Sequence, residues 1–152
     1  CYIRGTRSKV DDVFAEGSVK DVTKINVLNT GKKVAIFATG LMVQASLKAA
    51  EQLKAEGIDP TIVDVCCLKP ADEAGIAEVL KNHEVIVTCE EHNTVNGLGS
   101  LIADVASKST PRLITRVGMQ DQFAESGSFA ALLQKYGLDA NGIAEAVRKA
   151  VR

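Results

Sequence analysis

The sequence predicts an α/β fold built on a mainly parallel sheet that is covered on both faces. Apolar segments of strand length alternate along the chain with segments of helical periodicity, a pattern typical of parallel sheets with helical crossovers. Residues 34–38 form a continuous apolar run, as expected for a strand that is buried on both sides. Polar loops follow several predicted strands. We therefore expect the functional surface at the carboxyl ends of these strands.

The composition of the chain restricts the classes of protein to which it can belong. The chain has 152 residues, a net charge of −1, 46% hydrophobic and 24% charged residues, which suits one soluble globular domain. It offers no basic surface for nucleic acid or membrane and no apolar run of about 18 residues. Aromatic residues make up 4%, which disfavours a base-stacking surface. The cysteines lack metal-binding spacing, so we interpret them as small buried hydrophobes in a reducing, cytoplasmic compartment. They are Cys1, Cys66, Cys67 and Cys89.

The first quarter of the chain divides into an arm and two strands. Residues 1–24 are rich in charge and interrupted by glycine, which predicts a linker or arm. Residues 1–3 look like the end of a strand, so we expect a piece of a longer polypeptide. Strands are predicted over 25–28 and 33–39. This pair is either a hairpin or an antiparallel edge added to the sheet.

The middle of the chain is predicted to form a helix, a strand and a second helix. The first helix begins after Gly40 and ends at Gly57, which suits the C′ position. The strand covers 60–68. The second helix has Asp72 as its N-cap and runs through Lys81.

The remainder of the chain continues the alternation. Strands are predicted over 85–87 and 111–117, and Asp139 is expected to cap the last helix. Three helices are predicted, over 98–105, 129–136 and 142–151.

The most informative polar segment is a turn between the strand 85–87 and the helix that follows it. It contains Glu90, Glu91, His92 and Asn93. Acid–base chemistry would need one of the carboxylates to be buried. One imidazole with two carboxylates rarely completes a metal shell. We favour a hydrogen-bonded interface between subunits or domains over catalysis, and we predict no metal site.

The segment Gly40-Leu41-Met42 joins a strand to the start of a helix. Free N–H groups at a helix start can bind an anion or effector. The glycine-rich phosphate-binding motifs are absent, however, and Gly40 also suits close packing of strand and helix. Both interpretations stay open.

A third polar loop, 118–128, follows the last predicted strand. Asp121 and Glu125 could accept hydrogen bonds across an interface, and Phe123 is predicted to anchor in an apolar pocket. The alternative is a structured connection without a binding role.

Several short motifs follow one another in a characteristic order. They are Tyr2-Ile3-Arg4 with Arg7, Ala38-Thr39-Gly40, the segment 64–70, Glu90-Glu91-His92 with 97–100, Val117-Gly118 with Asp121, Phe123 and 125–127, and Leu133 with 135–139. Together they cover essentially the whole chain, and the set resembles the C-terminal domain of the transketolase family of thiamine-diphosphate enzymes. Transketolases split into two subunits are most similar. Deoxyxylulose-5-phosphate synthase and the β subunit of 2-oxoacid dehydrogenase E1 share the domain.

The resemblance implies a three-layer α/β/α fold with a five-stranded, mostly parallel sheet and one antiparallel strand. Residues 25–152 would form this domain, and residues 1–24 would be the arm from a preceding pyrimidine domain. The implied activity is transfer of a two-carbon ketol unit between phosphosugars, in the pentose phosphate pathway. The family binds thiamine diphosphate and Mg²⁺ or Ca²⁺ at a dimer interface.

The cofactor-binding segments of that family have no counterpart here. The Gly-Asp-Gly motif is absent, as is the segment with the glutamate that activates the cofactor. The resemblance therefore implies a structural, dimer-forming chain that binds no cofactor alone, has no catalytic residue and needs an N-terminal thiamine-diphosphate-binding domain or subunit as partner.

Two arginines in the arm are candidates for a substrate-phosphate ligand under this resemblance. Arg4 matches the position of the family's arginine, and Arg7 is the alternative. The planar guanidinium suits phosphate, although either residue could be a solvated arm charge. A different class of function, a stand-alone regulatory module that binds an anion at the Gly40 turn, is the second hypothesis.

Overall fold

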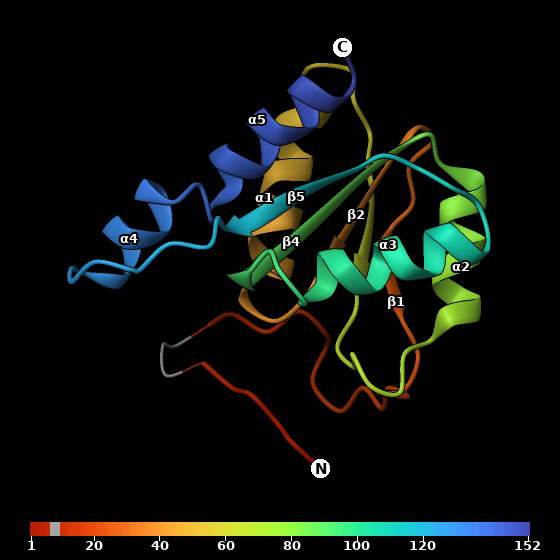
Figure 1. Cartoon of the computed structure of the whole chain (residues 1–152), viewed down its shortest axis with the longest axis horizontal. Coiled ribbons are helices and arrows are strands. Elements are labelled where there is room, and N and C mark those ends of the chain that lie inside the picture. The colour runs from red at the N-terminus through yellow and green to blue at the C-terminus, as the bar shows by residue number, and fades with distance from the viewer. Residues whose placement is uncertain (7–9) are drawn as a thin grey trace.

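The computed structural model describes residues 1–6 and 10–152, and in this part of the chain five strands form one mixed sheet between two layers of helices (Figure 1). The strands are β1 (Asn26–Asn29), β2 (Val34–Ala38), β3 (Thr61–Asp64), β4 (Val85–Asn93) and β5 (Ile114–Met119). The helices are α1 (Leu41–Lys54), α2 (Glu73–Asn82), α3 (Leu98–Lys108), α4 (Phe129–Lys135) and α5 (Ala140–Ala150). The strand order is β1-β3-β2-β4-β5. The predicted three-layer α/β/α fold is confirmed.

The first strand is the antiparallel edge of this sheet. It pairs with β3, with Asn26 opposite Asp64, whereas β2 pairs in parallel with β3 on one side and β4 on the other. The hairpin alternative is therefore wrong, because both edges of β2 are occupied by parallel neighbours. The loop before β2 crosses closely over the start of β3. A Cβ on Gly31 would lie 1.9 Å from the Asp59 carbonyl oxygen, so only glycine fits there.

The core consists of two apolar layers, one on each face of the sheet. Consecutive residues of a strand point to opposite faces, so Ile36 contributes to the α1/α5 layer while Ala35 and Phe37 contribute to the α2/α3 layer. All three side chains are fully buried. This double burial explains the continuous apolar run from which a covered strand was predicted.

Helix boundaries follow the predicted capping residues. Gly57 has φ +81° and donates its N–H to the carbonyl oxygen of Lys54, while the Ile58 N–H reaches the Leu53 oxygen. These two bonds define a Schellman motif, which confirms Gly57 as C′. Asp72 and Asp139 are N-caps as predicted. Their carboxylates accept hydrogen bonds from the N–H groups three residues later.

Three strands differ from the prediction by two or more residues at one end or both. The strand predicted over 60–68 ends at Asp64, after which the chain turns away from the sheet. The strand predicted over 111–117 begins and ends later, as β5. The strand predicted over 85–87 continues to Asn93, because β5 extends far enough to pair Met119 with Asn93. The polar Glu90–Asn93 segment is therefore the end of a strand and not a turn.

The early end of β3 also corrects the prediction for the cysteines. Cys89 on β4 is buried, but Cys66 lies beyond the sheet and is exposed, Cys67 is half-buried, and Cys1 is exposed on the arm. Phe123 is likewise fully exposed, contrary to the predicted pocket anchor. It lies in a segment that projects with α4 away from the sheet (Figure 1), and no described residue of α4 is fully buried.

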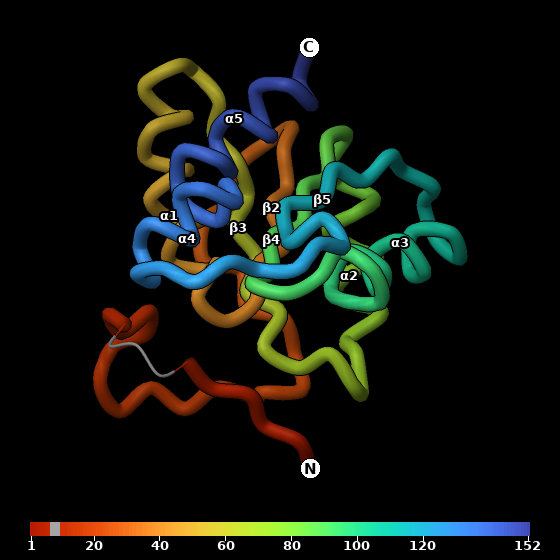
Figure 2. Tube along the Cα trace, turned by 60° about the vertical axis from the view of Figure 1, so that its left-hand side comes forward, coloured from red at the N-terminus to blue at the C-terminus, as the bar shows by residue number. Residues whose placement is uncertain are grey.

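The described residues of the N-terminal arm lie beneath the carboxyl ends of the parallel strands (Figure 2). Val13 packs against the α1/α5 layer, and the Lys20 ammonium lies 4.9 Å from the centre of the Phe14 ring. Lys24 and the Ile25 N–H both bond the Asp72 carboxylate, at 3.1 and 3.2 Å. The described arm thus contacts the domain at Val13 and at its end, next to Asp72.

Candidate functional site

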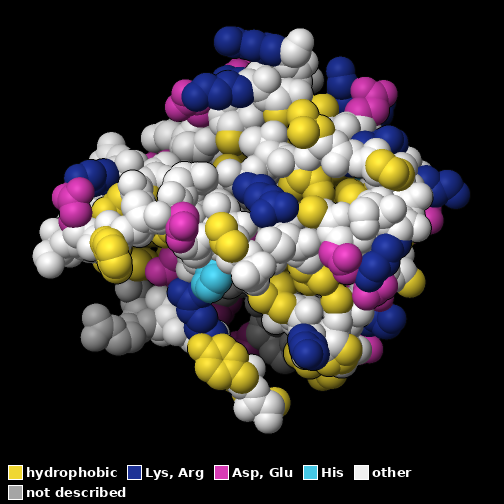
Figure 3. Space-filling view, in the orientation of Figure 1, with side chains coloured by type: hydrophobic (Ala, Val, Ile, Leu, Met, Phe, Trp, Pro, Cys, Tyr) yellow, Lys and Arg dark blue, Asp and Glu magenta, His cyan; other side chains and the backbone are white. Residues whose placement is uncertain are grey.

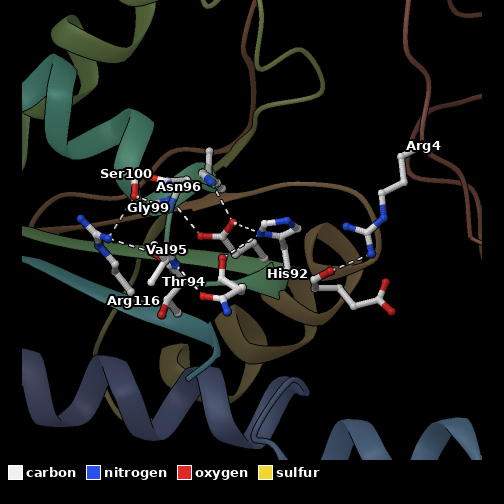
Figure 4. A network of polar contacts seen from close by, with 12 residues as sticks. Arg4, His92, Thr94, Val95, Asn96, Gly99, Ser100 and Arg116 are labelled. Carbon is white, nitrogen blue, oxygen red and sulfur yellow. Dashed lines mark hydrogen bonds and ion pairs between the residues drawn. The ribbon is translucent and has the colours of Figure 1, made fainter. Parts of the chain in front are cut away.

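The candidate site lies where the parallel strands end. Because β2, β3, β4 and β5 run in the same direction, their last residues share one edge of the sheet. Polar segments follow three of these strands, and the arm approaches the same edge with Arg4 (Figure 4). The sequence predicted this location from the order of strands and polar loops.

Glu90 is the most buried polar residue of this edge, with 1% of its surface exposed. Its carboxylate accepts hydrogen bonds from the N–H groups of Leu98, at 2.7 Å, and Gly99, at 2.9 Å. The preceding Gly97 is the N-cap of α3 and has no side chain with which to cap it. Glu90 therefore caps α3 from the neighbouring strand, where the helix dipole also favours a negative charge.

Gly97 makes room for this arrangement, since a Cβ at that position would lie 1.8 Å from the Glu90 Oε2 atom. Glu90 was predicted as an interface residue. Its side chain is instead enclosed by its own chain, because the two free N–H groups of α3 need an acceptor. The interface prediction continues to apply to its neighbours.

His92 and Asn93 lie at the surface next to this buried carboxylate. The His92 Nδ1 atom is 2.7 Å from the Asn93 carbonyl oxygen and 3.8 Å from Glu90 Oε2. Nδ1 carries the proton when it bonds this carbonyl oxygen, because a carbonyl can only accept. The Asn93 amide donates to Asp121 at 2.8 Å and accepts from the Val95 N–H. The bond to Asp121 joins the ends of β4 and β5.

Arg116 on β5 belongs to the same network, and the sequence analysis did not identify it. Its guanidinium donates to the Thr94 carbonyl at 3.0 Å and to the Ser100 hydroxyl at 3.2 Å. The Ser100 hydroxyl in turn accepts from the Asn96 N–H (Figure 4). The available signal was that Arg116 is the one charged residue among the six of β5. Its role is to hold the turn before α3 against β5.

Arg4 connects the arm to this edge by donating to the Glu91 carbonyl oxygen at 2.9 Å. Arg7 lies outside the described residues. The substrate-phosphate role predicted for either arginine remains a prediction. Arg4 also lines a cavity of about 280 Å³ together with Thr39, Gly40 and Asp64.

The cavity brings opposite charges together. Asp64 is buried, and this burial raises its pKa despite a hydrogen bond from Asn26. Burial and the nearby Asp64 carboxylate also raise the pKa of the Cys66 thiol, which lines the same cavity. A carboxyl facing Arg4 and the start of α1 weakens the attraction for an anion whenever it is ionised.

The turn Gly40–Met42 is less suited to binding an anion than its sequence indicated. Gly40 has φ +57° and begins α1 without a side-chain cap, as an anion-binding turn would require. Leu41 is half-buried, however, and Met42 is fully buried and already donates its N–H to the Thr39 oxygen. Anion binding here remains a prediction.

Glu125 lies apart from the other predicted interface residues. It is on the projecting segment, where it pairs with Lys135 at 2.6 Å, and its N–H donates to the Tyr136 hydroxyl. The structure thus gathers Glu91, His92, Asn93 and Asp121 at one edge and leaves Glu125 elsewhere.

Polar and apolar groups lie together at the surface of this edge. Val95, whose N–H donates to Asn93, is exposed at the polar network, and Figure 3 shows hydrophobic, basic and acidic side chains side by side on this face of the molecule. Tyr2 and Phe123 are also exposed, on the arm and on the projecting segment respectively. Among residues 1–6 and 10–152, no cluster of His, Cys, Asp and Glu is suited to a metal ion. No helix in the described chain could cross a membrane.

Comparison with known proteins identifies relatives across almost the whole chain. Residues 23–143 match the family model "Transketolase, C-terminal domain". A structure described as "Split gene transketolase, inactive beta4 tetramer" is 42% identical, with a TM-score of 0.90 over 95% of this chain and 47% of its own.

Two curated proteins extend the comparison. A 1-deoxy-D-xylulose-5-phosphate synthase of Caldanaerobacter subterraneus is 40% identical over 82% of this chain and 20% of its own length. A putative transketolase C-terminal section of Methanocaldococcus jannaschii is 34% identical over 99% of this chain and 48% of its own. The chain therefore spans between about a fifth and about half of the proteins it matches.

Proposed function

This chain belongs to the transketolase C-terminal domain family, and we propose that it is the C-terminal part of a transketolase. The complete enzyme would transfer a two-carbon ketol unit between phosphosugars in the cytoplasm and act as a homodimer. This part would be structural and dimer-forming, and inactive without its N-terminal partner domain or subunit.

One observation carries the choice of transketolase. The similarity to the split-gene transketolase chain extends over 95% of this chain at 42% identity and a TM-score of 0.90. That match includes most of the arm as well as the sheet domain. The family model, by comparison, begins only at residue 23.

The edge formed by Glu91, His92, Asn93 and Asp121 is the proposed docking surface for the partner. Its polar atoms are arranged by bonds within the chain, and the apolar side chain of Val95 lies exposed beside it. A surface with a polar network and apolar neighbours is typical of protein interfaces. Arg4 lies at the same edge, so a phosphate ligand role for it would place substrate at the junction with the partner.

The cofactor is assigned to the partner in this proposal. Thiamine diphosphate with Mg²⁺ or Ca²⁺ requires oxygen donors grouped around the metal, and the described residues supply no such group. These residues therefore do not fit the cofactor, and no chemical step is assigned to them. The contribution of this chain would be to position the partner and the substrate phosphate.

The test is a two-carbon transfer assay with xylulose 5-phosphate and ribose 5-phosphate, in the presence of thiamine diphosphate and Mg²⁺. We expect no turnover from this chain alone and turnover when it is mixed with a thiamine-diphosphate-binding N-terminal subunit. Substituting Arg4→Ala should raise KM for the phosphosugar, and Arg4→Lys should restore part of the loss. A mixture that stays inactive although both subunits are folded and associated would refute the assignment.

The second candidate is the equivalent domain of deoxyxylulose-5-phosphate synthase, which the 40% identity to the Caldanaerobacter protein favours. The same mixture assayed with a 2-oxoacid as the donor distinguishes the two activities. The 2-oxoacid dehydrogenase E1 β subunit would also use a 2-oxoacid donor but a different acceptor. A stand-alone anion-binding module would instead bind phosphate at the Gly40 turn without any partner.

A further inference from the structure

The outer edge of β5 is a second surface, which shares Arg116 with the polar network where the strands end. β5 is last in the strand order and is paired only with β4. Figure 1 shows β5 and α3 on the front of the molecule. The backbone on the outer side of β5 therefore has no strand partner within the described chain.

The two edge strands of the sheet, β1 and β5, differ in how readily each could pair with an added strand. β1 has four residues and a register shift between Val27 and Asn29, and a short, irregular edge strand is a poor template for another strand. β5 has six residues, and its pairing with β4 is regular from Ile114 to Val117; the register shift of this pair lies on β4, between Cys89 and Asn93. The β5 edge is the one that can accept an added strand.

A groove of about 350 Å³ runs beside this edge, between α3 and the start of β5. Ala103 and Ala106 of α3 line it with small side chains, and Ile114 lines it from β5. Leu113, which also lines the groove, is 91% exposed. The groove thus combines a recess for an apolar side chain with an adjacent free strand edge.

The charge of the groove is positive. Arg112 and Arg116 line it, and no carboxylate is among the described residues that line it. Within the described chain both arginines bond neutral groups: Arg112 donates to the carbonyl oxygens of His83 and Pro111, and Arg116 to a carbonyl and a hydroxyl. The neighbouring carboxylate, Asp104 of α3, is paired with Lys108 at 2.7 Å.

We propose that the β5 edge binds an extended acidic segment of another protein, which adds to the sheet as a sixth strand. Strand addition supplies main-chain hydrogen bonds, while alternate side chains of the added segment enter the groove. Carboxylates among these side chains pair with Arg112 and Arg116. A second copy of the chain fits less well, because pairing β5 with itself would bring the arginines of both copies to one edge.

The test measures binding of a fluorescein-labelled peptide to the full chain by fluorescence anisotropy. The peptide has about eight residues, the length of an ordinary strand; the positions on one face are valine and glutamate in turn, and those on the other face are threonine. We expect it to bind at least tenfold more tightly than the matched valine–lysine peptide. Methylating alternate backbone nitrogens of the acidic peptide should weaken binding at least tenfold. This second comparison separates strand addition from simple charge attraction.

Matched variants of the chain locate the site. Arg112→Glu should weaken binding of the acidic peptide about fivefold, because one exposed ion pair is lost and a repulsion added, while Arg112→Lys should stay within about twofold of the original. Lys48→Glu, at an exposed position of α1, is the control for net charge and should have no effect. Circular dichroism verifies that each variant folds.

Three results would overturn the proposal. The first is no binding of the acidic peptide at a concentration of about 1 mM, which corresponds to a binding free energy weaker than about −4 kcal/mol. The second is that the lysine peptide, or the methylated acidic peptide, binds as tightly as the unmodified acidic peptide. The third is a self-association in sedimentation velocity that Leu113→Glu abolishes, which would assign the edge to a second copy of the chain.

Discussion

The buried carboxylate of Glu90 is the sharpest test of the polar network, and we predict that Glu90→Gln destabilises the chain by about 3 kcal/mol. The carboxylate accepts two N–H bonds from the start of α3. A buried hydrogen bond to a charged group contributes about 1.5–3 kcal/mol, and a charge at a helix start about 0.3–1 kcal/mol. Glutamine keeps one acceptor oxygen but presents an amide donor to the second N–H, so one bond and the charge are lost.

The assay is urea unfolding followed by circular dichroism. With an m-value of about 2 kcal/mol per molar urea, the unfolding midpoint should fall by about 1.5 M. Hydrogen exchange should accelerate at whichever of the Leu98 and Gly99 amides then faces the glutamine amide group and loses its acceptor. Glu91→Gln is the matched control on the adjacent, half-buried position, and it should change stability by less than about 0.5 kcal/mol. Equal stabilities of the two variants would refute the capping role of Glu90.

Three further predictions follow from individual side chains. Burial opposes ionisation of Asp72, but hydrogen bonds from Ile25, Lys24 and Gly75 outweigh it and hold the pKa of Asp72 below its usual value. The ionised carboxylate therefore stabilises the folded chain above pH about 4, and this stabilisation is lost as the pH falls through the folded-state pKa. Asp72→Asn should thus lower the unfolding free energy by about 1 kcal/mol at pH 7. The difference in unfolding free energy between the variant and the original chain, measured by urea titration, should shrink toward pH 2. A difference that does not change with pH would contradict this. The Thr88 hydroxyl is buried and has no hydrogen-bond partner among the described residues, so Thr88→Val should leave stability unchanged or raise it by up to about 1 kcal/mol; a clear loss in thermal unfolding would show a partner for the hydroxyl. Burial raises the pKa of the Cys89 thiol to about 12. A thiol reagent at pH 8 should therefore label the exposed Cys1 and Cys66 in the folded chain, and Cys89 only in urea. Rapid labelling of Cys89 without urea would mean that β4 opens in the native state.

The order of elements could be predicted from the sequence because local patterns encode it. The apolar run of β2, the caps Asp72 and Asp139 and the C′ glycine Gly57 each act within a few residues of themselves. Such signals depend only on the periodicity of burial and on backbone conformation. The layers of the fold and the location of the polar edge follow from the same patterns.

Pairing partners and burial could not be predicted in the same way. Whether β1 joined β2 or β3 depended on which edge of the parallel sheet was left free. Glu90 and Glu91 are adjacent in sequence, yet the pleat of β4 turns one into the protein and leaves the other accessible. Strand ends shifted because pairing with β5 extended β4 to Asn93.

The sequence by itself therefore determined the class of fold, the succession of its elements and the edge at which its polar residues collect. The tertiary structure alone decided what each polar residue does there. It assigned Glu90 to the start of α3, Arg116 to the turn before that helix, and Asp64 to the cavity beside Arg4. The physical reason is that patterning acts over a few residues, whereas desolvation and hydrogen bonding depend on neighbours brought together from distant parts of the chain.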